Sequence, residues 1–261
     1  MGRDRPGSPA FRNLTPHYRF ELRRIPVSCD TGLPEQEPSM DIDSLTSYTR
    51  QYWSEAKDTH VADPAYYQLA ETQLRGIVER NLASGANVLD IGCGNGEYTR
   101  LLAARAQRVL AFDISDSLLA AARARCREFD NTFFLQADVA NTKLAFGQQA
   151  HAVFCMGLFA CLPDDAQVLR LLRDFADYLV NDGLLVLRES TMTGPQQYIR
   201  YASGHLGCYR NKQWLLESLR STGFELQEEI PLKAQFEPFN DYLVLRKRRA
   251  DQAGAAISDN R

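Results

Sequence analysis

The stretch Val88-Leu-Asp-Ile-Gly-Cys-Gly-Asn-Gly96 decides the fold of this chain. Its apolar start predicts a buried strand, and three alternating glycines follow that strand. Glycine permits a tight turn and lets the backbone approach a ligand closely. A helix expected over 97–106 would add free backbone N–H groups and the positive end of its dipole. The stretch therefore predicts a ligand-binding turn between a strand and a helix, preceded by the acid Asp90.

Apolar runs and helical periods alternate on both sides of this turn. Strands are expected over 86–92, 108–113, 131–138, 151–157, 184–189, 224–230 and 241–247. Nearly continuous apolar strands separated by helices indicate a parallel sheet that is covered on both faces. The last two strands have no helix between them, which favours an antiparallel edge. The predicted fold is α/β: a doubly wound, mainly parallel, seven-stranded sheet with an antiparallel last strand and helices on both faces.

The glycine spacing bears on the kind of ligand. A dinucleotide fingerprint needs G-x-G-x-x-G, but position 97 is Glu, and an acid two residues before the first glycine is foreign to that pattern. The D-x-G-x-G-x-G arrangement instead resembles motif I of class I S-adenosylmethionine-dependent methyltransferases. The resemblance covers roughly residues 45–248. It implies the Rossmann-like fold, S-adenosyl-L-methionine as cofactor, and methyl transfer as the activity.

The resemblance also implies roles for residues at successive strand ends. Asp113 would hold the ribose hydroxyls, although dinucleotide enzymes place an acid similarly, so Asp113 alone does not discriminate. Asp138 and Val139 would contact the adenine, and Met156 would line the methionine part. The implied cofactor-binding residues are Asp90, Gly92, Gly94, Gly96, Asp113, Ile114, Asp138, Val139, Met156, Tyr52 and Trp53.

An aromatic, polar segment precedes the first core helix. It contains Tyr48, Tyr52 and Trp53. Related enzymes use such a segment as a lid over the cofactor, so the resemblance implies that role here. The alternative is that these rings staple an N-terminal helix to the sheet.

Three residues are candidates for catalysis on the acceptor side. Glu189 follows the fifth strand and could orient or deprotonate an acceptor; the alternative is an exposed or ion-paired acid beside Arg188. His205, whose reference pKa lies near neutrality, and Tyr209 lie in a glycine-rich segment where the family usually contacts substrate. The alternatives are a solvated histidine and a packing tyrosine. His151, at the opposite end of the fourth strand, is expected to be structural.

The composition of the chain limits the kinds of molecule that we expect it to bind. The chain has 261 residues and a formal charge of -3, which argues against nonspecific binding to nucleic acid or acidic membranes. No apolar run reaches the roughly 18 residues of a membrane span. Six scattered cysteines without C-x-x-C predict no metal site and a reducing cytoplasm. The basic residues 246–249 are expected to be exposed to solvent where the chain leaves the last strand.

Three segments are expected along the chain: a flexible head, 1–39, rich in proline; a methyltransferase domain, 40–249; and a flexible tail, 250–261. Met40 could be the native start, or the head could be a regulatory arm. The predicted function is methyl transfer to N or O of a small-molecule acceptor by in-line displacement. The alternatives are a peptide or protein acceptor, and a noncatalytic protein that binds S-adenosylmethionine or scaffolds a partner.

Overall fold

The computed structural model describes residues 40–59, 64–145, 149–233, 235 and 237–249. All of them belong to the unit Pro34–Arg261, the larger of two into which the chain divides. The predicted head, 1–39, and tail, 250–261, lie outside the described residues, so their flexibility and the boundaries at 40 and 249 stay predictions.

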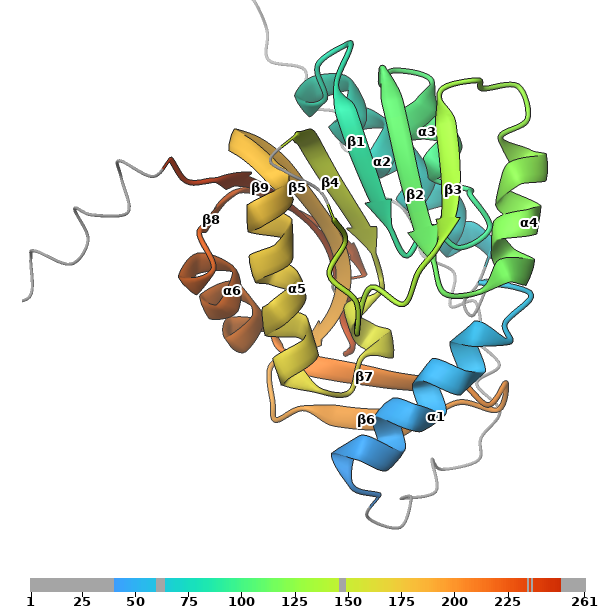
Figure 1. Cartoon of the computed structure of the whole chain (residues 1–261). Coiled ribbons are helices and arrows are strands. Elements are labelled where there is room, and N and C mark those ends of the chain that lie inside the picture. The colour runs from blue at the N-terminus through green and yellow to red at the C-terminus, as the bar shows by residue number, and fades with distance from the viewer. Residues whose placement is uncertain (1–39, 60–63, 146–148, 234, 236, 250–261) are drawn as a thin grey trace, which may run out of the picture. The chain divides into compact units, whose positions relative to one another are not determined.

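A nine-stranded sheet forms the centre of the described part of the chain (Figure 1). The strands are β1 (Asn87–Ile91), β2 (Arg108–Asp113), β3 (Thr132–Gln136), β4 (Ala150–Met156), β5 (Leu179–Met192), β6 (Gln197–Arg200), β7 (Leu206–Asn211), β8 (Phe224–Lys233) and β9 (Phe239–Lys247). Strands β3, β2, β1, β4 and β5 are adjacent in that order and parallel. Strand β9 runs antiparallel to β5, and β8 pairs with β9. The predicted fold class is confirmed.

The predicted count of seven strands needs a correction, because β6 and β7 also join the sheet. They form an antiparallel pair, and β7 pairs with β5 at Thr191 and Met192. Both lie in the segment between the fifth strand and the next helix, where no strand was predicted. Glycines interrupt its apolar residues, so no strand period is visible there. The long β5, whose end extends past β4, offers the partner that the local sequence cannot reveal.

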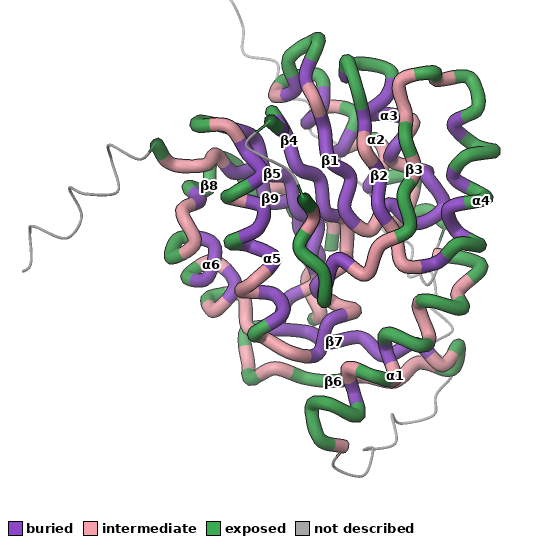
Figure 2. Tube along the Cα trace, in the orientation of Figure 1, coloured by how far each residue is buried: buried purple, intermediate pink, exposed green. Residues whose placement is uncertain are grey.

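Helices cover both faces of the sheet (Figure 2). They are α1 (Ile42–Ser54), α2 (Pro64–Asn81), α3 (Thr99–Ala103), α4 (Asp116–Arg125), α5 (Asp165–Tyr178) and α6 (Lys212–Ser221), with a short 3₁₀ helix η1 (Phe159–Cys161). Apolar residues of α5 and α6 pack against alternate residues of β1, β4 and β5. Those of α2 and α3 pack against the other alternate set. This pattern is what a parallel sheet buried on both faces requires.

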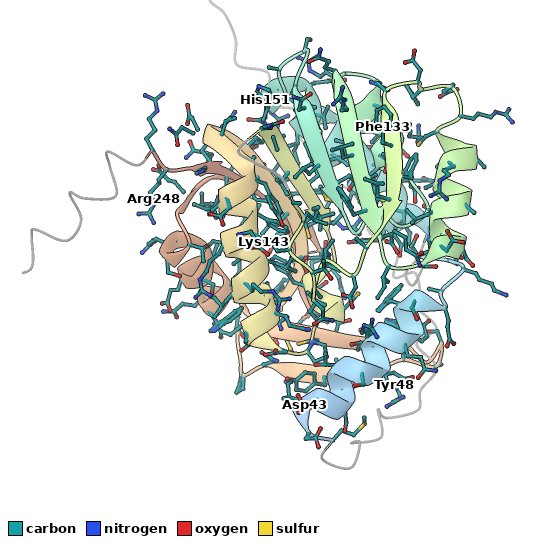
Figure 3. The ribbon with its side chains drawn as sticks, viewed as in Figure 1. Asp43, Tyr48, Phe133, Lys143, His151 and Arg248 are labelled. Carbon is teal, nitrogen blue, oxygen red and sulfur yellow. The ribbon has the colours of Figure 1, made fainter. Side chains whose placement is uncertain are left out.

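The two ends of the parallel strands differ. Helix α1 and the β6–β7 hairpin lie across the carboxyl ends (Figure 1). His151, the second residue of β4, lies at the opposite end of the sheet from Tyr48 of α1 (Figure 3). Its Nδ1 accepts the backbone N–H of Asn87 at 3.0 Å. This contact supports the structural role expected for His151.

Two kinds of feature are absent from the described residues. Among the helices that the structure describes, none combines the length and the apolar character needed to cross a membrane. Within the same residues, no group of three or more His, Cys, Asp or Glu side chains is arranged to hold a metal ion.

Candidate cofactor and acceptor site

The glycine turn after β1 requires backbone conformations that favour glycine. Gly92, Gly94 and Gly96 have φ values of 73°, 55° and 77°. A Cβ on Gly96 would lie 2.9 Å from the backbone of Ala122 in α4. A Cβ on Gly94 would lie 2.7 Å from the Thr59 methyl group. The turn is therefore held closely between α4 and the segment that follows α1.

The helix after this turn is shorter than predicted. It was expected over 97–106, whereas α3 spans Thr99–Ala103. Residues 97 and 98 belong to the turn itself, because the three left-handed glycines delay the start of regular helix. With only five residues, α3 offers less of the helix dipole than the sequence suggested.

Asp90 lies inside the protein. It is 2% exposed, and its Oδ2 accepts the Thr99 hydroxyl at 2.7 Å. Burial raises the pKa of Asp90 to about 7. The side chain thus fixes the start of α3 relative to β1, so its visible contribution to the site is support of the glycine turn.

Asp113 joins the end of β2 to the glycine turn. Its Oδ2 accepts the backbone N–H of Gly94, and its Oδ1 accepts that of Ser115, both at 2.9 Å. Burial raises the pKa of this carboxyl group, although the backbone hydrogen bonds oppose that shift. The next residue, Ile114, accepts the Gln136 side-chain amide on its carbonyl. Asp113 is therefore held in one orientation at the carboxyl edge of the sheet.

Asp138 lies beyond the end of β3 and contacts α1. Its Oδ2 accepts Nε of Arg50 at 2.6 Å and the Asn141 amide at 2.9 Å. Val139 is buried in the core beside it. Sequence reasoning missed Arg50, since nothing in the local pattern of α1 shows which strand end its polar face meets.

Aromatic residues of α1 dock on the loop that joins β6 to β7. The Tyr48 hydroxyl donates to the Gly204 carbonyl at 2.5 Å, and the Arg200 guanidinium lies 4.2 Å from the Tyr48 ring. The Tyr52 hydroxyl approaches the Ser203 carbonyl at 3.5 Å. These rings join α1 to the hairpin, while Arg50 joins it to the end of β3.

His205 is enclosed by aromatic rings. It is 6% exposed, stacks on Tyr201 with ring centroids 4.2 Å apart, and shares a 2.7 Å hydrogen bond with the Ser203 hydroxyl. Trp53 and Tyr52 lie at centroid distances of 6.4 Å and 6.3 Å. Burial lowers the pKa of His205 to about 4, so the imidazole is neutral at pH 7. The structure therefore brings three predicted site residues, His205, Tyr52 and Trp53, together.

Tyr209, the third catalytic candidate from the sequence, contacts Tyr201. Its hydroxyl pairs with the Tyr201 hydroxyl, and burial raises its pKa above that of a free tyrosine. The Tyr209 hydroxyl also lies 2.5 Å from where a Cβ of Gly207 would be. The ring thus packs over β7 and supports Tyr201, which in turn stacks on His205.

Glu189 is buried rather than exposed, with 2% exposure. Its two oxygens accept the backbone N–H groups of Phe159 and Ala160 at 3.1 and 3.3 Å. Burial raises its pKa to about 7. Arg210 lies nearby but forms its ion pair with Asp165. Glu189 therefore holds η1 and lines a small interior cavity, which has room for about one water molecule.

Met156 ends β4 beside a residue that sequence reasoning did not select. Its carbonyl lies 3.5 Å from Nη2 of Arg188, which is buried on β5 opposite Met156. The sequence does contain a sign of this residue: Arg188 directly follows the apolar run 184–187, and a charged side chain is unexpected in a buried strand.

Comparisons with known proteins agree with this geometry. A family model described as a methyltransferase domain matches residues 88–183, which include the glycine turn and β1 to β4. The ubiquinone biosynthesis O-methyltransferase of Methylococcus capsulatus is 29% identical over 136 residues, covering 49% of this chain and 53% of that protein. The chain spans about half the length of the curated relatives that it matches first.

Solved structures resemble the chain over a larger part. The 1,6-didemethyltoxoflavin-N1-methyltransferase of Burkholderia thailandensis, solved with its substrate and S-adenosylhomocysteine, has a TM-score of 0.65 and 17% identity, covering 83% of this chain and 94% of that one. The [4+2]-cyclase SpnF has a TM-score of 0.59 and 17% identity, covering 81% and 98%. The chain therefore has the class I methyltransferase fold, and the resemblance read from its sequence is confirmed at that level.

Proposed function

We propose that this protein is an S-adenosylmethionine-dependent methyltransferase that methylates nitrogen or oxygen of a small molecule. The observation that carries the proposal is the Asp113 carboxylate, held by the backbone of Gly94 and Ser115 beside the glycine turn. The matched methyltransferase domain and the names of the relatives support the same activity. The relatives named for quinones and for toxoflavin support a small-molecule acceptor.

The residues at the strand ends fit the cofactor. Asp113 keeps acceptor lone pairs beyond its two backbone hydrogen bonds, so it can receive ribose hydroxyls. Asp138 is one strand further out and can receive an amino group of the adenine, in place of or beside Arg50. Gly94 leaves no room for a side chain against Thr59, as a closely fitted turn requires.

The protein contributes mainly alignment. When bound, S-adenosylmethionine supplies a methyl group already activated for displacement by its positive sulfur. The residues of the chain then have to orient the acceptor and exclude water, and orientation supplies about 7–11 kcal/mol in favourable cases. Helix α1, tied to Asp138 and to the loop around Gly204, covers this edge of the sheet and serves that exclusion.

His205 is the group best suited to orient the acceptor proton. Its imidazole is neutral at pH 7, and because its pKa is only about 4 it is a weak base, so it can accept a hydrogen bond from a hydroxyl or amine group of the acceptor rather than hold the released proton. Within the described residues, the buried Nε1 of Trp53 has no hydrogen-bond partner, so it can donate to an acceptor beside His205. Glu189 and Tyr209 act as positioning residues, through η1 and Tyr201 respectively.

Calorimetry tests the cofactor assignment. S-adenosylhomocysteine should bind the protein, and NAD should not. Asp113→Asn keeps the shape of the side chain but removes its charge, so it should weaken binding by about tenfold or more, as expected for a hydrogen bond to a charged group. Binding of NAD alone, or an unchanged affinity in the variant, would contradict the assignment.

A second candidate function is a reaction other than methyl transfer, because the [4+2]-cyclase SpnF shares this fold. Two further alternatives are a noncatalytic protein that binds the cofactor and a methyltransferase that acts on peptides. One experiment tests all three. Labelled methyl groups from S-adenosylmethionine should enter small molecules of a cell extract. Label in protein, or no label despite cofactor binding, would favour these alternatives.

A further inference from the structure

Among the residues that the structure describes, a buried arginine at the carboxyl edge of the sheet has no acidic partner. Arg188 is 9% exposed, and within the described ranges no Asp or Glu oxygen forms an ion pair with it. Its neighbour in sequence, Glu189, points to the other face of the sheet, against η1. Burying an unpaired charge costs several kcal/mol, so a guanidinium in this position calls for an explanation.

The groups around Arg188 are neutral. Nη1 lies 2.5 Å from the Tyr98 hydroxyl, and the guanidinium carbon lies 5.0 Å from the Tyr98 ring centre and 5.8 Å from that of Tyr66. Nη2 approaches the Met156 carbonyl. Within the described part of the chain, the buried Nε has no hydrogen-bond partner at all. The tyrosines orient and partly stabilise the cation, but they do not neutralise it.

The position of Arg188 relates it to the proposed cofactor. Along the carboxyl edge the order is Asp138 after β3, Asp113 on β2, the glycine turn after β1, Met156 on β4 and Arg188 on β5. Asp113 on β2 and Arg188 on β5 are three strand spacings apart, or about 14 Å between their backbones. A long arginine side chain directed back over β4 shortens that distance, and its Nη2 lies 3.5 Å from where a Cβ of Gly157 would be.

We propose that Arg188 binds the carboxylate of the amino-acid part of the cofactor, a role that rests on the proposed function. With the ribose at Asp113 and the adenine at Asp138, the amino-acid part extends towards β4 and β5. A carboxylate there neutralises the guanidinium and accepts its free N–H groups, which suit bidentate recognition of a planar anion. Tyr98, just after the glycine turn, fixes the guanidinium in place.

The test compares two ligands by calorimetry. S-adenosylhomocysteine has the amino-acid part, whereas 5′-methylthioadenosine lacks it and keeps the adenosine. Arg188→Met removes the charge and keeps an unbranched side chain. We expect it to weaken S-adenosylhomocysteine binding about ten- to one-hundred-fold and to leave methylthioadenosine binding unchanged. Arg188→Lys should recover part of the loss, because it restores the charge without the planar fork.

Control measurements distinguish a wrong role for Arg188 from a wrong cofactor assignment. Arg75→Met, at an exposed arginine of α2 paired with Glu71, should change neither affinity. An equal loss of both ligands in Arg188→Met, or no loss of either, would overturn the role of Arg188. A wild-type protein that binds neither ligand would instead defeat the cofactor assignment, and with it this inference. Unchanged methylthioadenosine binding also shows that the variant is folded.

Discussion

Two acids at neighbouring strand ends have different environments. Asp90 is enclosed and accepts a hydrogen bond from Thr99 beside its own turn, whereas Asp113 spans two chain segments through backbone N–H groups. The sequence motif pairs these acids with one ligand. The structure shows that one supports the turn while the other presents its carboxylate at the edge. A substitution at Asp90 should therefore act first on stability.

Asp90→Asn should change how stability depends on pH. The folded-state pKa of Asp90 is about 7, above the value of 3.8 for an unperturbed aspartate. The folded protein thus keeps a proton that the unfolded chain releases, so this group's contribution to stability is fully present below about pH 4 and declines up to about pH 7. The wild-type free energy of unfolding should fall relative to that of the variant by up to about 1.4 kcal/mol per pH unit in this window.

Denaturant titrations at several pH values measure this difference. Asp130→Asn, at an exposed position before β3, serves as the control and should leave the slope unchanged. The buried Glu189, whose pKa is also raised to about 7, is present in all three proteins, so its contribution cancels. Parallel stability curves for wild type and Asp90→Asn would contradict the prediction.

At the scale of elements, α1 connects two parts of the edge. Arg50 contacts the end of β3, and Tyr48 contacts Gly204 and Arg200 of the β6–β7 hairpin. The lid and staple interpretations are thus compatible in this structure, since one helix both covers the edge and is fastened to it. Cofactor exchange would then require these contacts to open.

Arg200→Ala should loosen α1. Removing the guanidinium from the Tyr48 ring loses a cation–π contact of about 0.5–1 kcal/mol, so amide hydrogen exchange in α1 should rise about two- to fivefold. Exchange in α5, which packs on a face of the sheet, should not change. Gln197→Ala, an exposed residue of the same strand, is the matched control. Equal exchange in both variants would show that Arg200 does not fasten the helix.

Predictability from sequence differed between elements for physical reasons. Strands β1, β2, β4 and β5 are largely apolar and bounded by turns, so their burial on both faces is visible in the sequence. The β6–β7 pair depends on the end of β5, a long-range partner that local residues do not encode. For the same reason Asp113, Gly94 and His205 could be selected from the sequence, whereas the contact of Asp113 with Gly94 and that of His205 with Tyr201 required the structure.

At the scale of the whole molecule, the described core consists of clusters packed on the faces of one sheet. Its buried apolar residues run from Leu45 in α1 to Leu245 in β9. The clusters on the two faces of the sheet share strands β1, β4, β5 and β9, so neither face can lose its packing independently. Unfolding should therefore be cooperative, and buried groups on different elements should become accessible together.

The cysteines report this cooperativity. Cys93, Cys126, Cys155 and Cys208 are buried, and burial raises the pKa of Cys126 to about 11 and that of Cys208 to about 12. A shift from 9 to about 11 lowers the thiolate fraction at pH 8 about 100-fold, before any shielding is counted. In a chain of residues 40–249, which lacks Cys29, a disulfide reagent should modify these thiols slowly and with similar rate constants. Those rates should slow further with S-adenosylhomocysteine, because a ligand that binds only the folded state suppresses unfolding. Rapid modification of one buried thiol without the others would show that its element opens by itself.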